Sequence, residues 1–163
     1  MSAAANIDYL TGVANRRATA EALRQALSRP HGHGQMLSVI LLDIDNFKQI
    51  NDTFGHAVGD RVLIELADTL RQHLRGTDML GRWGGEEFLI IAHAIGDDQI
   101  AELAERLRII VATHSYALVG RLTLSLGVAR AQRADTPEAL VKRADDALYQ
   151  AKEGGRNRVQ LVV

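Results

Sequence analysis

Two acidic segments of the chain could together hold a divalent metal ion against a nucleotide. The first is the run Arg82-Trp83-Gly84-Gly85-Glu86-Glu87-Phe88, in which two neighbouring carboxylates follow a glycine pair. The second is the apolar run 39–45, which ends in Asp43-Ile44-Asp45. Mg²⁺ commonly takes one or two protein carboxylates together with substrate phosphate oxygens. Asp43 and Glu86 supply that number, so the two segments indicate a phosphoryl-transfer site.

Each of these carboxylates also has an ordinary explanation, since Asp43 could merely end a strand and Glu86 could merely decorate a turn. Their joint occurrence, beside two glycines that allow close backbone approach, favours the metal site.

Further polar residues have the groups needed to bind a nucleoside triphosphate. Segment 46–52 offers backbone N–H groups and Lys48 to phosphates. Asn51 and Asp60 could read a guanine edge, because a carboxylate accepts hydrogen bonds from the N1 and N2 hydrogens of the base. Turn formation and helix capping are equally good explanations of these two residues. Lys152 and Arg156 could neutralise terminal phosphates or belong to a solvated surface.

The periodicities predict the elements that must position these residues. Leu37–Leu42 is a nearly continuous apolar run, which predicts a central strand covered on both faces. Strands at Met79–Trp83 and Phe88–Ala92 are expected to form a hairpin, whose glycine pair adopts positive φ. The other expected elements are helices at Arg16–Ser28, from a cap at Asp60 to about Leu74, around Ile100–Val111 and from Thr136 to Gly154, strands at Leu122–Ala129 and Arg158–Val163, and a loop at Pro30–Gly34 with solvent-exposed His31 and His33.

This order predicts an α/β fold with a mixed, partly antiparallel sheet flanked by helices. A helix separates the first strand from the hairpin, so the end of that strand and the hairpin tip can become neighbours on one edge. We therefore expect Asp43 and Glu86 to lie close together.

Composition limits the class of protein. The chain has 163 residues, 47% of them hydrophobic, and a formal net charge of −1. We interpret residues 1–163 as one domain. The even charge balance argues against nucleic-acid binding and against membrane contact by this segment. There is no cysteine, no apolar stretch long enough to cross a bilayer and no signal peptide, so a cytoplasmic location is expected.

The chain resembles the GGDEF domain of bacterial diguanylate cyclases, with Gly84-Gly85-Glu86-Glu87-Phe88 as a variant of the signature motif. The resemblance spans nearly the whole chain. It rests on ordered matches at Asp8-Tyr9-Leu10-Thr11-Gly12, Asn15-Arg16-Arg17, the segment from Asp43 to Asp52, Phe54-Gly55-His56, Gly59-Asp60, Ser125-Leu126-Gly127-Val128, Ala144-Asp145, Tyr149, Ala151-Lys152 and Gly155-Arg156-Asn157.

The resemblance implies a palm-like nucleotidyl cyclase fold with a ferredoxin-like core and a mostly antiparallel sheet. It implies that two domains, each holding one GTP, meet as a homodimer and produce cyclic di-GMP and pyrophosphate. Two Mg²⁺ or Mn²⁺ ions would be held by Asp43, the main-chain carbonyl of Ile44, and Glu86. Glu86 and Glu87 would be catalytic, with the proton acceptor left open between them and water. The implied substrate-binding residues are Phe47, Lys48, Asn51, His56, Asp60, Lys152 and Arg156.

A second motif implies control by the product. Arg75-Gly76-Thr77-Asp78 precedes Gly84 by the five-residue spacer found in family members that bind cyclic di-GMP as an inhibitor. Arg75 and Asp78 therefore resemble this inhibitory site, with Arg106 as its secondary arginine. An ordinary local ion pair between Arg75 and Asp78 is the alternative.

An active cyclase competes with two other readings of the motifs. A noncatalytic receptor for GTP or cyclic di-GMP would not need the metal pair, and a cyclase for another nucleotide is disfavoured by Asp60. We also expect that regulation comes from a sensory or dimerising segment outside this chain.

Overall fold

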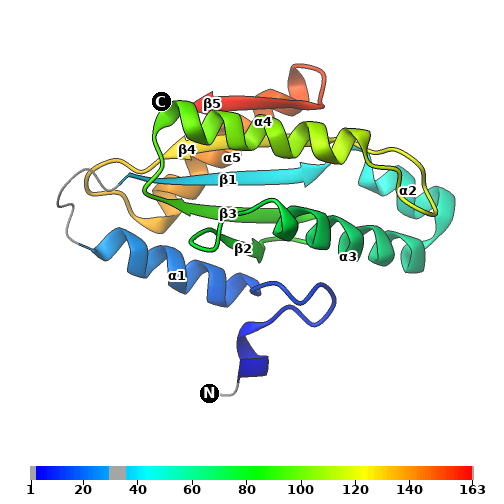
Figure 1. Ribbon diagram of the computed structural model, residues 1–163, viewed down its shortest axis with the longest axis horizontal. Helices are drawn as coiled ribbons and strands as arrows, with labels where there is room; N and C mark the ends of the chain where they lie inside the picture. The colour runs from blue at the N-terminus through cyan, green and yellow to red at the C-terminus, as the bar shows by residue number, and fades with distance from the viewer. Residues whose placement is uncertain (1–2, 30–35, 163) are drawn as a thin grey trace.

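The computed structural model describes residues 3–29 and 36–162, and its framework is a five-stranded sheet with strand order β2-β3-β1-β4-β5 (Figure 1). The strands are β1 (Leu37–Ile44), β2 (Met79–Arg82), β3 (Glu87–His93), β4 (Leu124–Arg130) and β5 (Arg158–Val162). Only β4 and β5 pair in parallel, whereas β1 pairs antiparallel with both β3 and β4. The predicted mixed, mostly antiparallel sheet is therefore confirmed.

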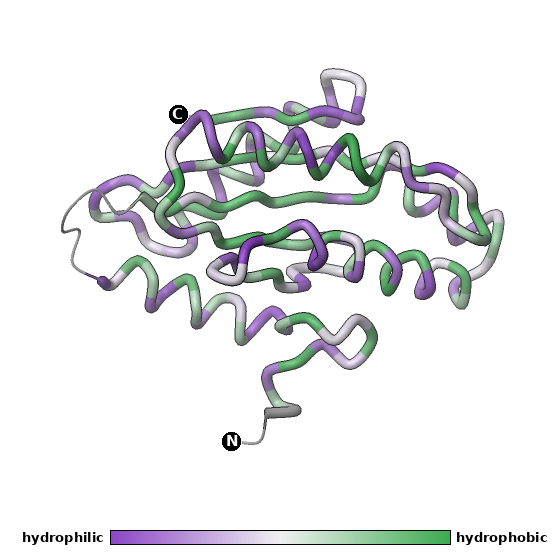
Figure 2. The backbone as a smooth tube through the Cα atoms, viewed as in Figure 1, coloured by the Kyte–Doolittle hydropathy of each residue, from purple (hydrophilic) through white to green (hydrophobic). Residues whose placement is uncertain are grey.

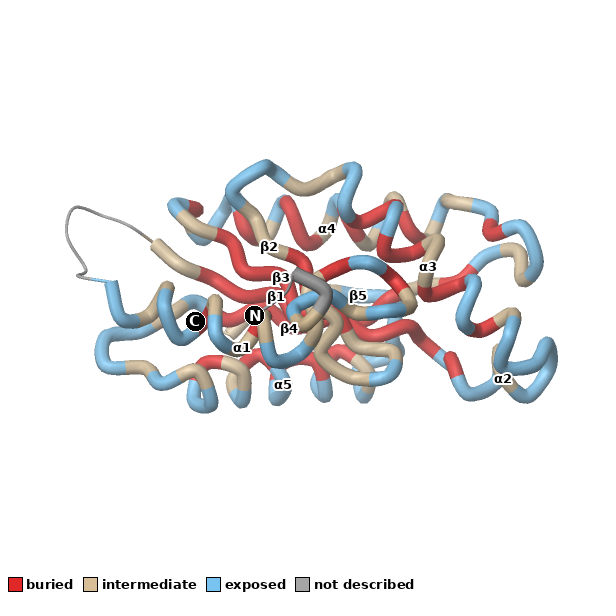
Figure 3. Tube along the Cα trace, turned by 90° about the horizontal axis from the view of Figure 1, so that it is seen from below, coloured by how far each residue is buried: buried red, intermediate tan, exposed pale blue. Residues whose placement is uncertain are grey.

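Helices cover both faces of the sheet (Figure 3). One face carries α3 (His56–Gln72) and α4 (Asp97–Thr113), and the other carries α1 (Arg16–Ser28) and α5 (Pro137–Glu153). A short 3₁₀ helix (Ala3–Asn6) precedes α1, and α2 (Phe47–Phe54) connects β1 to α3. None of the described helices has the length and hydrophobicity needed to cross a membrane.

The apolar run of β1 forms the centre of the core, as the sequence predicts (Figure 2). Successive side chains of a strand point to opposite faces. Ile40 and Leu42 therefore pack beneath α3 and α4, whereas Val39 and Leu41 pack beneath α1 and α5. Full burial of each such side chain stabilises the fold by roughly 1.5–3 kcal/mol. The central strand is therefore a rigid base for the aspartates at its end.

Helix starts are confirmed at two of the three predicted places. Asn15 caps α1 by accepting a hydrogen bond from the N–H of Ala18, and Thr136 caps α5 in the same way. Asp60 was expected to cap a helix, and this prediction is wrong because α3 already begins at His56. The cap position is Gly55, whose φ of 91° breaks the chain between α2 and α3.

Helix α2 is an addition to the predicted order of elements, because segment 46–52 was expected only as a phosphate-binding segment. The loop predicted at Pro30–Gly34 lies outside the described residues, and so does Val163 at the end of the last predicted strand.

Helix α5 approaches β4 so closely that Gly127 admits no side chain. A Cβ atom there would lie 2.2 Å from the carbonyl oxygen of Ala144 and 2.4 Å from the nitrogen of Leu148, both in the α5 backbone. We expect Gly127→Ala to lower the free energy of unfolding by about 3 kcal/mol, because the helix must move away from the sheet.

Urea denaturation measures this loss. Gly76→Ala is the matched control, since a Cβ there meets nothing within 4 Å, and its effect should stay within about 0.5 kcal/mol. Equal midpoints for the two variants would contradict the close approach of α5.

Candidate functional site

The end of β1 and the tip of the β2-β3 hairpin lie side by side, as expected. Asp43 is the register partner of Glu87 across the antiparallel pair, so their side chains share the face covered by α1 and α5. Glu86 directly precedes Glu87, and its carboxylate interacts electrostatically with Asp43. The structure therefore brings together the three carboxylates that the sequence singled out.

Asp43 is a buried carboxylate with only one of its two oxygens hydrogen-bonded. The residue is 5% exposed, its Oδ2 accepts from the Lys152 ammonium, and its Oδ1 has no partner. Burial raises the pKa of Asp43, and the negative charge of Asp45 adds to this effect, while Lys152 opposes it. An unpaired buried oxygen is costly, so this atom is a natural ligand for a cation.

Glu86 and Glu87 extend the same negative field. Burial raises the pKa of both, and the charge of Asp43 raises them further. Lys152 is the cation among these groups, and its pKa is raised because the three carboxylates outweigh its own burial. Three carboxylates and one ammonium leave a net charge of −2, which one divalent ion would balance.

These groups fit a metal site that a substrate completes. Among the described residues, no cluster of three or more acidic or histidine side chains is already arranged around one point. Mg²⁺ is usually bound by one or two protein carboxylates, and phosphate oxygens and water occupy its other coordination positions.

Asp45 has a different role from Asp43, although both lie at the end of β1. Its carboxylate accepts hydrogen bonds from the hydroxyls of Thr123 and Ser125, both at 2.6 Å, and from the backbone N–H of Asn157 at 2.9 Å. All three donors are distant in the sequence. Asp45 thus anchors the loop after α5, and local sequence reasoning missed this function.

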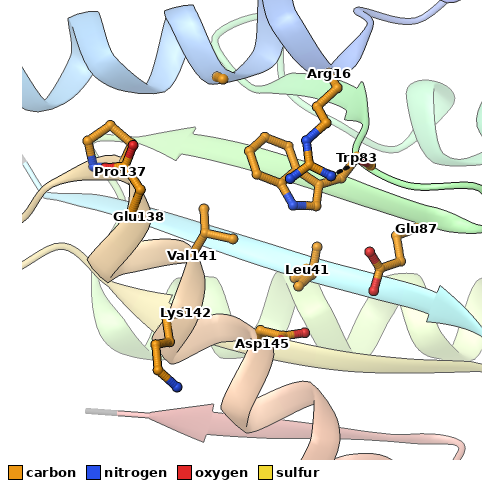
Figure 4. A pocket seen from close by; sticks show the side chains of 10 residues that line it. Arg16, Leu41, Trp83, Glu87, Pro137, Glu138, Val141, Lys142 and Asp145 are labelled. Carbon is orange, nitrogen blue, oxygen red and sulfur yellow. Dashed lines mark hydrogen bonds between the residues drawn. The ribbon is translucent and has the colours of Figure 1, made fainter.

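The hairpin tip is held by residues from the N-terminal segment, a role that the sequence analysis also missed. Arg82 donates to the Asp8 carboxylate and to the carbonyl of Gly85, at 3.2 and 2.8 Å. Arg16 donates to the carbonyl of Trp83 at 2.9 Å and lies over its ring (Figure 4). The partners in the Arg16–Trp83 and Arg82–Asp8 bonds lie 67 and 74 positions apart, so no local signal could have revealed them.

The glycine pair does not adopt the positive φ that was predicted, because residues 83–86 form a four-residue connection, and such loops are commonly built on turns with negative φ. A Cβ at Gly84 would lie 2.9 Å from a carboxylate oxygen of Glu87, so a side chain there would require only the flexible end of Glu87 to move.

The two candidate guanine readers lie at the corner between α2 and α3. A Cβ on Gly59 would lie 1.9 Å from Oδ1 of Asn51, so the Asn51 side chain packs directly against the residue before Asp60. Asp60 itself is exposed. The structure therefore brings Asn51 into the immediate neighbourhood of Asp60.

The other nucleotide-site candidates surround this corner. Lys48 in the first turn of α2 and His56 at the start of α3 are both exposed. Phe47 is 8% exposed and belongs to the core, so only its main chain can face a ligand. A Cβ on Gly59 would lie 3.3 Å from the tip of the Phe47 ring, so this ring packs against the corner between α2 and α3.

Lys152 and Arg156 occupy distinct positions. Lys152 was proposed as a phosphate contact, and here its ammonium pairs with Asp43 inside the carboxylate cluster. Arg156 is exposed on the loop after α5, where it has a positive φ of 64°. Its neighbour Asn157 is held by Asp45 and accepts a hydrogen bond from Arg108 of α4 at 2.9 Å.

The three candidate inhibitory residues also come together. Arg75 forms the local ion pair with Asp78 at 2.8 Å, and the same guanidinium nitrogen donates to the carbonyl of His93 at 2.8 Å. The Asp78 side chain is 0% exposed, whereas that of Arg75 is 43% exposed. Arg106 donates to the carbonyl of His73, two residues before Arg75. Arg106 is thus tied to the segment that directly precedes the Arg75–Asp78 pair.

Because these carboxylates repel one another, neutralising one of them should raise the stability of the fold in a pH-dependent way. The pKa of Glu87 lies above its ordinary value of 4.5, so the folded state binds this proton more tightly than the unfolded state does. Its contribution to stability is therefore lost as the pH rises above about 4.5. We expect Glu87→Gln to raise the urea midpoint near neutral pH in metal-free buffer, with a smaller gain toward pH 4.5.

Glu102→Gln, on the exposed side of α4, serves as the control and should change nothing. If the Glu87→Gln midpoint followed the wild type at every pH, solvent would have to screen this carboxylate fully.

Comparison with known proteins identifies the family. The chain matches the family model described as diguanylate cyclase, GGDEF domain, over residues 5–158. It is 45% identical over 158 residues to the response regulator PleD of Caulobacter vibrioides, which covers 93% of this chain and 35% of PleD. It is 42% identical over 157 residues to the diguanylate cyclase DgcP of Pseudomonas aeruginosa, which covers 94% of this chain and 23% of DgcP. The chain thus spans about a quarter to a third of the length of these relatives.

A solved structure shares the fold over nearly its whole length. The GGDEF domain of DgcB from Caulobacter crescentus, determined in complex with c-di-GMP, superposes with a TM-score of 0.92 at 33% identity, covering 99% of this chain and 98% of that one. The palm-like cyclase fold expected from the sequence is therefore confirmed. Because the family model covers nearly all of the chain and full-length similarity accompanies it, the chain belongs to the GGDEF domain family of diguanylate cyclases.

Proposed function

We propose that the chain is a diguanylate cyclase domain that condenses two GTP molecules into cyclic di-GMP and releases pyrophosphate. One observation carries this proposal: Asp43 has a buried, unpaired oxygen beside Glu86 and Glu87, in a cluster with a net charge of −2. A domain that only bound a nucleotide as a receptor would gain nothing from keeping this unneutralised charge.

The metal site would consist of Asp43, the main-chain carbonyl of Ile44, and Glu86, with two Mg²⁺ or Mn²⁺ ions per active site. When bound, these ions lower the pKa of the attacking 3′-hydroxyl and stabilise the charge that develops on the α-phosphate. Lys152 offsets one of the carboxylate charges, and we assign it to a phosphate group of the substrate as well.

Asn51 and Asp60 would read the guanine edge, and Lys48, His56 and Arg156 would contact the rest of the nucleotide, with the main chain of Phe47 at the start of α2. The packing of Asn51 against Gly59 supports this assignment, because it holds an amide beside the exposed Asp60 carboxylate. Asp60 disfavours adenine, which presents no matching pair of donors.

Glu87 is the carboxylate that we assign to the proton of the 3′-hydroxyl. Its pKa is raised by burial and by the charges of Asp43 and Asp145, and a base works best when its pKa lies nearer to the working pH. Asp43 and Glu86 are taken up by the metal assignment, which leaves Glu87 available.

Condensation of two GTP molecules requires two domains, each presenting one nucleotide to the other in a homodimer. We treat residues 1–163 as one such domain, active where GTP is available in the cytoplasm.

Turnover at varied protein concentration tests this function. With GTP and Mg²⁺, we expect cyclic di-GMP, detected by chromatography, at a specific rate that rises with protein concentration because domains must pair. Asp43→Asn should lower this rate by roughly 100-fold, since it removes a metal ligand. Asp98→Asn, an exposed change in the first turn of α4, is the matched control and should retain full activity.

Absence of product at every concentration, with GTP still bound, would favour the receptor instead. Full activity of Asp43→Asn would refute the metal assignment.

We also propose that Arg75, Asp78 and Arg106 bind cyclic di-GMP and inhibit the enzyme. The bound product in the DgcB structure supports such binding in a relative. We expect Arg75→Ala to weaken cyclic di-GMP binding by roughly 10- to 100-fold, because hydrogen bonds from a charged group are lost. Isothermal titration calorimetry measures the affinity.

Arg71→Ala removes the nearby exposed Arg71–Asp68 ion pair and is the control, which should bind the product normally. Undiminished affinity of the Arg75→Ala protein would exclude this inhibitory site.

A further inference from the structure

A cavity of about 600 Å³ lies between α1, the hairpin and α5, next to the carboxylate cluster (Figure 4). Leu41 contributes to its lining and lies two residues before Asp43 on the same face of β1. The cavity thus continues along the sheet from the carboxylate cluster, and Glu87 belongs to both. Its volume is typical of small-molecule sites.

One part of the cavity wall is apolar. Its lining includes the indole of Trp83 and the side chains of Leu41 and Val141. Arg16, which also lines the cavity, holds Trp83 in place, because its guanidinium lies 4.3 Å from the ring centroid and donates to the Trp83 carbonyl. A rigid aromatic wall of this kind suits a ligand with a planar apolar body.

The charges around the cavity are unbalanced. Three carboxylates line it, those of Glu87, Glu138 and Asp145, and no side chain of the described residues forms a hydrogen bond or an ion pair with any of them. Of the two cations of the lining, Lys142 is paired with Asp146 at 3.3 Å, whereas Arg16 lies over the neutral ring of Trp83 and offsets only one of the three carboxylates. The unmatched charge of the cavity is therefore negative.

A bare metal ion needs a compact shell of oxygen ligands, and the apolar part of this lining does not supply one. Carboxylates spread around an apolar wall are instead matched by a cation that carries its own apolar surface.

We propose that this cavity binds a small organic cation, an ammonium attached to a flat apolar body, with the ring against Trp83 and the charge toward Asp145 and Glu87. The site is separate from the α2–α3 corner proposed for guanine. A bound cation would add positive charge beside Glu87, which is the carboxylate assigned above to the proton of the 3′-hydroxyl.

Fluorescence tests the binding directly, because Trp83 is the single tryptophan of the chain. Three probes of similar size share a phenyl ring and a two-carbon chain but differ in charge: 2-phenylethylamine is positive, 2-phenylethanol is neutral and phenylacetate is negative. None absorbs where indole can be excited selectively. We expect a saturable change in Trp83 emission with the amine, weaker binding of the alcohol and the weakest binding of the acid. The readout needs no GTP, so its result is independent of cyclase turnover.

Two variants distinguish this site from general attraction to an acidic surface. Asp145→Asn should weaken binding of the amine by roughly three- to fivefold, as expected for the loss of one partly exposed ion pair. Glu102→Gln removes an equal charge from the far face of the sheet and should leave the affinity unchanged. Circular dichroism checks folding, and Glu138→Gln replaces Asp145→Asn if that variant does not fold.

No saturation with the amine would overturn the proposal. Equal affinities for the amine and the acid, or equal losses in the Asp145→Asn and Glu102→Gln proteins, would do the same.

Discussion

A buried carboxylate at the end of a hydrophobic strand is the constraint around which this domain is organised. The strand β1 is buried along almost its whole length. Asp43 at its end is therefore largely shielded from solvent. A charge in such surroundings must be paired or must bind a cation. Lys152 supplies one partner from α5, and the free Oδ1 is left for a ligand.

Three further devices follow from this constraint. The register of β1 with β3 aligns Asp43 with Glu87, so a slip by one residue would send one of these carboxylates to the opposite face. The close approach of α5 to Gly127 brings Lys152 within reach of the strand end. Asp45 ties the loop after α5 to β4, and this loop carries Arg156. The two aspartates at the strand end thus differ in role: Asp43 has an oxygen free for a ligand, and Asp45 positions the loop after α5.

Local patterns in the sequence predicted most of the elements, because their signals lie within a few residues of each other. The apolar run of β1, the start of α1 after Asn15 and the cap at Thr136 are examples. The error at Asp60 arose because two helix starts compete there, and a positive φ at Gly55 decides between them. Propensity alone did not reveal that Phe47–Phe54 is a separate helix, since its apolar residues are few.

The missed parts of the site depend on contacts that are remote in sequence. The side-chain and backbone donors to Asp45 lie 78 to 112 positions away, and Arg82 reaches Asp8 across 74 positions. No window of neighbouring residues contains both partners of such a bond. The pairing of Lys152 with Asp43 is of the same kind, and it explains why a lysine expected at a phosphate sits among carboxylates.

Helix α4 connects two regions that the sequence treated as unrelated. Arg106 donates to the carbonyl of His73 beside the proposed inhibitory motif, and Arg108 donates to Asn157 beside Arg156. Both arginines belong to one continuous helix that packs on the sheet. The two loops are therefore hydrogen-bonded to the same rigid element. A ligand at one loop can influence the other only if it favours one of two positions of that element, since coupling requires a difference in binding energy between states. The contacts at Arg106 and Arg108 are where such a difference would be expressed, because each joins the helix to a loop by a single exposed hydrogen bond.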